Sequence, residues 1–326
     1  MCGLTGWFDF RRQCQRQDLE RMTAALHHRG PDSDGYFVEN GLALGFRRLA
    51  IIDLVTGDQP LFSEDERLVL VCNGEIYNYR ELAAELVAKG HTFRTRSDVE
   101  VLLHLYEEHG VAMLERLNGQ FSFALYDRAA RQLLLARDPF GINPMFYAEV
   151  GGTLFFGSEI KAILEHPQVS REVDLTGLDQ VLTFPGLVGS RTLFAGIRCL
   201  EAGHFLRVSA TGLEDREYWD LVYPTQNEAA SSADESFYVD GLRDRLEQAV
   251  RYRLQADVPV GFYLSGGVDS SLIGALIAQA TGGNPGRSFS ISFTDEEISE
   301  ARYQRLMAER LGSEHHEIRF DWREIS

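Results

Sequence analysis

The chain has little of what marks membrane-spanning, secreted or nucleic-acid-binding proteins. Its 326 residues contain no sustained block of Lys or Arg, and the formal net charge of −17 would repel a phosphate backbone. No apolar run approaches the roughly 18 residues of a membrane span. The first residues, MCGLTGWFDFRRQ, lack the basic and then apolar order of a secretory signal. These absences predict that neither nucleic acid nor a membrane is a partner.

Cysteine is also scarce. Cys2, Cys14, Cys72 and Cys199 are widely and irregularly spaced, which fits neither a disulfide framework nor a paired metal motif. We therefore expect a reducing compartment, and the cytoplasm in particular. The apolar residues, 44% of the chain, suffice for two buried cores, so two domains are expected.

The first two hundred residues alternate short β-rich runs with a few helices, which predicts a sheet-dominated α+β fold. A helix is expected over 98–109, with Ser97 and Glu100 as a capping-box pair. The other expected helices cover about 17–28 and 78–89, and the expected strands cover 68–74, 119–127, 131–138, 144–150 and 153–159.

Residues 209–234 lose periodicity and gather Ser, Ala and acidic residues, which is typical of a linker. We expect one domain over 1–208 and a second over 235–326. After a long amphipathic helix, the second domain alternates strands and helices over 258–264, 270–281, 288–293, 299–311 and 315–319. Such alternation indicates an α/β parallel sheet.

A glycine-rich loop follows the first strand of the second domain. PVGFYLSGGVDSS (259–271) runs an apolar strand through Ser265-Gly266-Gly267 into a helix whose first N–H groups would face an anion. It has neither Walker A nor GxGxxG spacing. Asp269 is anomalous beside an anion unless it holds a cation such as Mg²⁺. The alternative is a simple strand-to-helix turn with Asp269 as a helix cap.

Cys2 stands directly behind the initiator methionine. Removal of Met1 would leave a thiol and a free α-amine on one residue, and an amine of pKa about 7.7 to 8.0 can take a thiol's proton near neutral pH. Cys2 is therefore a candidate nucleophile that carries its own base, although a lone Cys at position 2 is usually a chance residue.

Eight short motifs decide between these alternatives. They are Cys2-Gly3-Leu4, HRGPD (28–32), RLAIID (48–53), NGEIYN (73–78), SDVE (97–100), RDPFG (137–141), SEIKA (158–162) and LSGGVDSS (264–271). In this order they resemble the glutamine-hydrolysing asparagine synthetase family. The resemblance implies a class II glutamine amidotransferase domain with the N-terminal-nucleophile hydrolase fold, made of layered antiparallel sheets with helices. It also implies that an ATP-pyrophosphatase domain follows.

The resemblance implies roles for residues of several of these motifs. Cys2 attacks glutamine, while the Asn73 side chain and the Gly74 N–H stabilise the oxyanion. Glutamine is bound by Arg48, Ile51, Ile52, Asn73, Gly74, Glu75 and Asp98. ATP and pyrophosphate are bound by Leu264, Ser265, Gly266, Gly267, Asp269, Ser270 and Ile291, with Mg²⁺ at Asp269. From the residues alone, Asn73-Gly74 also fits a type I′ hairpin turn, and Asp98 fits an acid in a first helical turn.

The implied reaction hydrolyses glutamine and passes ammonia to an adenylated carboxylate, most simply that of aspartate, giving asparagine, AMP and pyrophosphate. The alternatives are a different carboxylic-acid acceptor in specialised metabolism and a non-catalytic binding relative. A homodimer stays open. The sequence departs from the family pattern in two places. Asn143 stands where Lys is common, and the second domain stops early, so we expect it to be incomplete.

Overall fold

The computed structural model describes residues 1–9, 14–39, 41–225, 234–295 and 297–321. The chain divides into two compact units, Met1–Val222 and Tyr223–Ser326. Each unit has its own hydrophobic core. The two units are described separately below.

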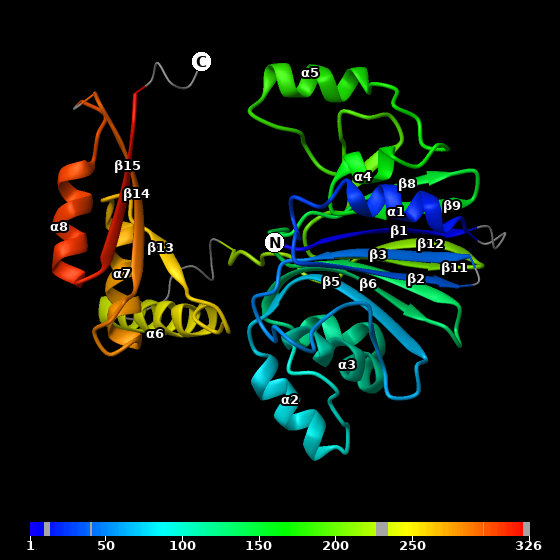
Figure 1. Cartoon of the computed structure of the whole chain (residues 1–326), viewed down its shortest axis with the longest axis horizontal. Coiled ribbons are helices and arrows are strands. Elements are labelled where there is room, and N and C mark those ends of the chain that lie inside the picture. Colours follow the sequence, from blue (N-terminus) through cyan, green and yellow to red (C-terminus); the bar gives the residue numbers. More distant parts are fainter. Residues whose placement is uncertain (10–13, 40, 226–233, 296, 322–326) are drawn as a thin grey trace. The chain divides into compact units, whose positions relative to one another are not determined.

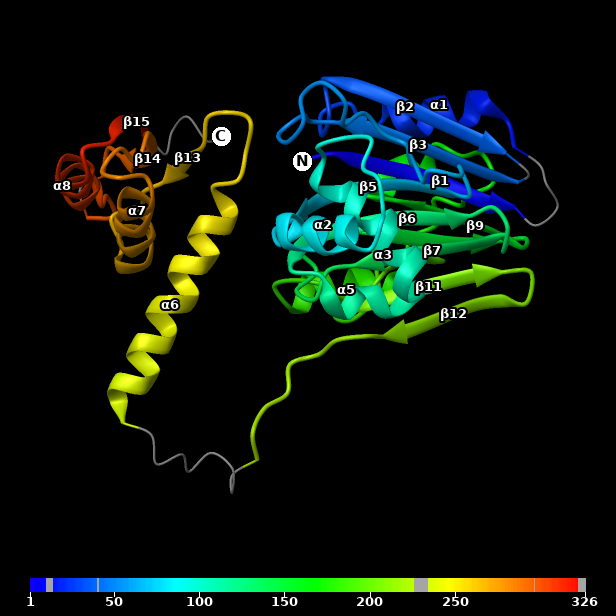
Figure 2. The same cartoon turned by 90° about the horizontal axis from the view of Figure 1, so that it is seen from below.

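Two six-stranded antiparallel sheets form the centre of the first unit and stack on each other (Figures 1 and 2). The first sheet has the order β10-β8-β9-β1-β3-β2 and the second the order β12-β11-β7-β6-β5-β4. The first sheet consists of β1 (Gly3–Asp9), β2 (Ser33–Glu39), β3 (Leu42–Arg48), β8 (Phe146–Val150), β9 (Thr153–Gly157) and β10 (Ile197–Cys199). The second consists of β4 (Leu61–Phe62), β5 (Leu68–Ile76), β6 (Gly119–Asp127), β7 (Gln132–Arg137), β11 (His204–Ser209) and β12 (Gly212–Glu217).

The alternation of side chains along β5 shows why its sequence is apolar throughout. Val69 and Val71 join the core between the two sheets, whereas Leu68, Leu70 and Cys72 join the core on the other face. A strand that is buried on both faces needs a continuous apolar run. The layered α+β architecture predicted from the sequence is therefore confirmed.

Helices cover the outer faces of both sheets. The outer face of the second sheet packs on α2 (Tyr79–Ala88), α3 (Val101–His109) and the 3₁₀ helices η1 (Asp98–Glu100) and η2 (Gly110–Arg116). The outer face of the first packs on α1 (Arg16–Ala24) and α4 (Ile160–Leu164). A further helix, α5 (Leu175–Thr183), has Asp174 as its N-cap, and the carboxylate of this residue accepts from two N–H groups of the first turn.

Two local expectations for the first unit are wrong. Ser97 makes no side-chain cap bond. Glu100 instead turns back to accept from the N–H groups of Arg94 and Thr95, both at 2.7 Å, because the preceding loop packs over the helix start. The stretch 209–234 contains β12, which pairs with β11, so the first unit continues past residue 208. Residues 226–233 of that expected linker lie outside the described residues.

The second unit contains the predicted parallel sheet. Its strands β13 (Gly261–Tyr263), β14 (Arg287–Phe293) and β15 (Glu314–Phe320) pair in chain order, and its helices are α6 (Glu235–Arg253), α7 (Val268–Ala280) and α8 (Ala301–Leu311). Along β14 the serines are buried, whereas Phe289 and Ile291 on the opposite face are 38% and 52% exposed. Across the described parts of both units, no helix is both long and apolar enough to span a bilayer.

Candidate active site

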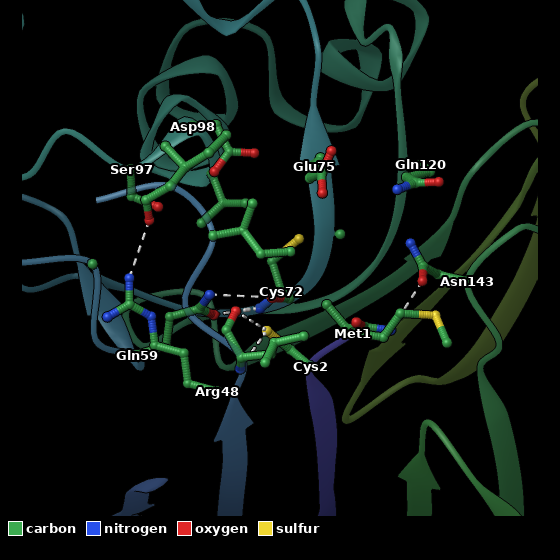
Figure 3. Close-up of a pocket in the computed structure, with 17 residues that line it drawn as sticks. Met1, Cys2, Arg48, Gln59, Cys72, Glu75, Ser97, Asp98, Gln120 and Asn143 are labelled. Carbon is green, nitrogen blue, oxygen red and sulfur yellow. Dashed lines mark hydrogen bonds between the residues drawn. The ribbon is translucent and has the colours of Figure 1, made fainter. Parts of the chain in front are cut away.

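A pocket in the first unit lies where β1 begins and where β3 and β5 end. Every predicted glutamine-site residue lines it, and Figure 3 shows the labelled members around a common hollow. These residues are Cys2, Arg48, Ile51, Ile52, Asn73, Gly74, Glu75 and Asp98. The fold thus brings four separate segments of the chain to one place.

Cys2 is held against the end of β3. The Leu49 N–H donates to the Cys2 Sγ at 3.4 Å, and the Arg29 guanidinium donates to the Cys2 carbonyl oxygen at 2.8 Å. Burial raises the pKa of the Cys2 thiol, although the hydrogen bond from Leu49 opposes this effect. Because the thiolate is the reactive form, a thiol with a raised pKa needs a base at neutral pH.

Met1 also lines the pocket, and burial lowers the pKa of its α-amine. With Met1 in place, the amine and the thiol belong to neighbouring residues. The hypothesis that Cys2 supplies both groups therefore stays a prediction, and it requires removal of Met1.

Arg48 fastens the loop that carries Ile51 and Ile52. Its guanidinium donates to the carbonyl oxygens of Ile52 and Asp53 at 3.2 and 2.5 Å and to the Asp58 carboxylate at 2.9 Å. The side chain is only 7% exposed. Its position on the pocket wall places a buried cation, already ordered, where an anionic group of a ligand can approach.

Asn73 and Gly74 lie inside β5, opposite Ser122 and Phe121 of β6. The hairpin-turn interpretation of this Asn-Gly pair is therefore wrong, because the strand continues to Ile76. A Cβ atom on Gly74 would lie 2.2 Å from the Gln120 carbonyl oxygen, so only glycine fits. The backbone of β5 can thus approach its neighbour closely at the pocket wall.

Asp98 is the first residue of η1 and is 5% exposed. Its carboxylate accepts from the Ile76 N–H at 2.8 Å. Burial, reinforced by the nearby charge of Glu75, raises the pKa of Asp98 to about 7. Asp98 is thus both an acid in a first helical turn and a pocket residue, which fits both of the roles weighed from the sequence.

The pocket contains polar residues to which sequence reasoning gave no role. The Gln59 side-chain amide makes two hydrogen bonds to the backbone of Cys72. Its Nε2 donates to the carbonyl oxygen, and its Oε1 accepts from the N–H. Asn143, which the sequence marked only as a departure from the family pattern, accepts from the Asn73 Nδ2 at 3.2 Å. Its own Nδ2 is buried and makes no hydrogen bond. Gln120, Ser97 and the apolar Val99 also line the pocket.

The predicted phosphate loop lies between β13 and α7. Gly266 has a φ of +89°, and Gly267 is the N-cap of α7. Ser265 and Ser270 brace the loop, because their hydroxyls lie 3.0 Å apart and Ser270 Oγ also accepts from the Ser265 N–H at 3.2 Å. The helix-cap alternative for Asp269 is wrong, since that residue lies in the first turn with an exposed side chain.

Leu264 and Ile291, which were both expected to bind ATP, differ in their surroundings. Leu264 is fully buried in the core of the second unit, so its side chain is not available to a ligand. Ile291 lies on the exposed face of β14. The Gln304 side chain ties these segments together by donating to the carbonyl oxygens of Ser265 and Ile291 at 3.2 and 3.0 Å.

Two protein families match different parts of the chain. Residues 1–219 match the glutamine amidotransferase domain family, and residues 241–326 match the asparagine synthase family. The chain belongs to the family of glutamine-hydrolysing asparagine synthetases. This family consists of ligases that carry an amidotransferase domain.

Several named relatives resemble this asparagine synthetase family member over nearly its whole length. Asparagine synthetase [glutamine-hydrolyzing] 3 of Bacillus subtilis (strain 168) is 38% identical over 97% of the chain, and asparagine synthetase 2 of the same strain is 36% identical over 98%. The amidase chyE of Penicillium rubens is 34% identical over 93%. The chain covers 54%, 44% and 47% of these relatives, so it spans about half their length.

Solved structures support the fold. The glutamine phosphoribosylpyrophosphate amidotransferase of B. subtilis, complexed with ADP and GMP, aligns with a TM-score of 0.52 at 18% identity, covering 98% of this chain and 81% of that one. The allosteric regulatory enzyme of purine biosynthesis aligns with a TM-score of 0.54 at 17% identity, covering 98% and 80%. At these identities the likeness concerns the fold alone.

Proposed function

We propose that the first unit hydrolyses glutamine to glutamate and ammonia through Cys2. The observation that supports this most is the convergence of Cys2, Arg48, Asn73, Gly74 and Asp98 on one pocket. The Cys2 sulfur attacks the side-chain carbonyl carbon of glutamine while the thiol proton moves to the α-amine of Cys2 itself. The C–N bond then breaks, the leaving ammonia takes a proton, and water hydrolyses the thioester.

The pocket offers groups that match each part of glutamine. Arg48 provides a positive charge for the α-carboxylate, which would replace Asp58 as the acceptor of the Nη1 donor. Asp98 and Glu75 provide acceptors for the α-ammonium. The Asn73 amide and the Gly74 N–H supply donors for the tetrahedral oxyanion. Ile51 and Ile52 form the wall beside them. The test is glutamate release from glutamine by this chain, and no release by the intact protein would contradict the proposal.

Asp98 must be ionised to bind an ammonium group, so its raised pKa predicts a pH-dependent affinity. The KM for glutamine should fall as pH rises through about 7, the pKa of this carboxyl. Asp98→Asn should raise KM by at least about 30-fold and remove this pH dependence, because the amide keeps the bond from Ile76 but has no charge. Steady-state kinetics between about pH 6 and pH 8 measure both effects.

The same substitution should stabilise the ligand-free protein. A carboxyl whose pKa is higher in the folded than in the unfolded state holds its proton more tightly when folded, so its ionisation destabilises the fold as pH rises. Asp98→Asn should therefore raise the unfolding temperature more at about pH 8 than at about pH 5. An unchanged KM would argue against a role for Asp98 in binding, whatever the stability shows.

Asn143 is expected to act through Asn73. Its Oδ1 accepts from Asn73 Nδ2 and so fixes the orientation of the Asn73 amide within the pocket. Asn143→Leu, which keeps the volume but has no acceptor, should lower kcat by about 10- to 100-fold with little change in KM, since the oxyanion forms only in the transition state. In an Asn73→Ala background the same substitution should have little further effect. Additive losses would contradict the coupling.

For the whole protein we propose that the second unit activates a carboxylate with ATP and that ammonia displaces AMP from the adenylate. Backbone N–H groups of the loop from Ser265 to Ser270 would hold the pyrophosphate, and Asp269 would hold Mg²⁺. The exposed Asp269 carboxylate at the start of α7 fits a cation beside bound phosphates. Mg²⁺ would neutralise phosphate charge there.

Aspartate is the proposed acceptor, since the relatives are named asparagine synthetases. A different carboxylic acid in specialised metabolism is the second candidate, because one relative of similar identity is named an amidase and not an asparagine synthetase. Acceptor-dependent pyrophosphate release by the full-length protein separates the two. The four free cysteines support a cytoplasmic location. A homodimeric state stays a prediction.

A further inference from the structure

Two histidines and a glutamate form a compact cluster outside the Cys2 pocket. His91 lies in the loop after α2, whereas His104 and Glu107 lie three residues apart on α3 and so share one face of that helix. Their candidate ligand atoms all lie within 4.8 Å of one another. None of the three lines the Cys2 pocket.

The two distances from Glu107 to the histidines match those between ligands of one ion. Glu107 Oε2 lies 3.5 Å from His91 Nδ1 and 3.3 Å from His104 Nδ1. Tetrahedral Zn²⁺ with bonds of about 2.0 to 2.2 Å separates its ligand atoms by about 3.3 to 3.6 Å. Two imidazole nitrogens therefore face one carboxylate oxygen at the spacing that a shared metal ion would set.

The outer nitrogens of both rings face further carboxylates. His91 Nε2 lies 3.2 Å from Glu108 Oε1, and His104 Nε2 lies 3.8 Å from Glu100 Oε1. Metal-bound histidines usually direct their second nitrogen to such a partner, which fixes the ring and the tautomer. His104 is 1% exposed, and its Nε2 makes no hydrogen bond, so this ring is placed by packing and by the contact of its Nδ1 with Glu107.

The surroundings favour a cation and leave a path to the cluster. A hollow beside it is lined by Glu64, Asp65, Glu107 and Glu108, with Lys89 as the only basic residue other than His91. Lys89 is itself paired with Glu85 and Glu108, at 3.1 and 3.2 Å. The excess of carboxylates makes the local potential negative.

We propose that His91, His104 and Glu107 bind a divalent transition-metal ion, with Zn²⁺ as the best match and a water molecule at the fourth position. Imidazole nitrogens with one carboxylate oxygen suit Zn²⁺ better than Mg²⁺ or Ca²⁺, which prefer oxygen ligands. The ion would tie the loop after α2 to α3, directly after the η1 segment that carries Asp98. Its role would be structural.

The test measures Zn²⁺ binding to the full chain in a Cys2→Ala background, which removes the reactive thiol as a competing ligand. Titration against a chromophoric chelator should give one site with a dissociation constant below about 1 μM. His91→Gln and Glu107→Gln should each weaken binding by at least about 30-fold, and both residues are partly exposed, so folding should survive. His316→Gln, which removes an exposed histidine from β15, is the matched control and should bind as the parent does.

Co²⁺ provides the second measurement. Its absorption spectrum should show tetrahedral coordination without thiolate charge-transfer bands, and Zn²⁺ should raise the unfolding temperature of the parent but not of His91→Gln. Binding weaker than about 100 μM, equal affinity in the two ligand variants, or thiolate bands in the Co²⁺ spectrum would overturn the proposal. None of these readouts depends on glutamine hydrolysis, so the metal-site proposal and the proposed activity are tested independently.

Discussion

The Cys2→Ala variant is expected to lose glutamine hydrolysis by at least about 1,000-fold in kcat, because the reaction then has no atom to form the thioester. The binding groups Arg48 and Asp98 stay in place, so glutamine should still bind. The measurement is glutamate formed from glutamine by purified protein, with isothermal titration of glutamine as the check on binding.

Cys14→Ala is the matched control for this loss. Cys14 is a free cysteine of intermediate burial that does not line the pocket, and burial raises the pKa of its thiol to about 11. Its removal should leave kcat within about twofold, as is usual for a substitution away from the chemistry. Equal activities of native protein and Cys2→Ala would remove the proposed mechanism and leave the non-catalytic binding relative as the better interpretation.

The sequence predicted the second sheet of the first unit better than the first sheet. Runs such as GQFSFALYD (119–127) are long, apolar and bounded by turn signals, and β6 matches that prediction in full. No strand was predicted over Gly3–Asp9, although β1 is central in its sheet, because its two glycines weaken the β signal. Gly6 is required there, since a Cβ atom would lie 2.1 Å from the Ala43 carbonyl oxygen. Such a close approach is set by a distant strand and leaves no local pattern.

The candidate site shows the same limit. Its motif residues were found through resemblance. The fold brings Cys2 and the seven residues predicted to bind glutamine to one pocket. The contact between Asn73 and Asn143 joins residues seventy positions apart, so spacing along the chain does not reveal it. The unusual Asn143 was the only signal. For Gln59, whose partner Cys72 lies on β5, the sequence offered none.

A fixed extension of the N-terminus should inactivate the glutaminase even though the Cys2 thiol remains. Burial raises the pKa of that thiol, so attack at neutral pH depends on a base, and in the proposed mechanism the base is the α-amine of Cys2 itself. One additional residue that cannot be removed converts this amine into an amide, which accepts no proton. Because a positioned base contributes about 10²- to 10⁴-fold, kcat should fall by that factor while glutamine binding is largely kept.

A cleavable extension turns this prediction into a rescue experiment. The same added residues, followed by a protease site that leaves Cys2 first, should be inactive before cleavage and fully active after it, with intact mass confirming each state. The thiol is present in both forms, so the gain on cleavage measures the amine and not the nucleophile. Full activity in uncleaved protein, or in native protein that retains Met1, would show that another group takes the proton. His28 of the neighbouring HRGPD motif is poorly placed for that role, because its Nε2 contacts the Glu159 carboxylate at 2.9 Å.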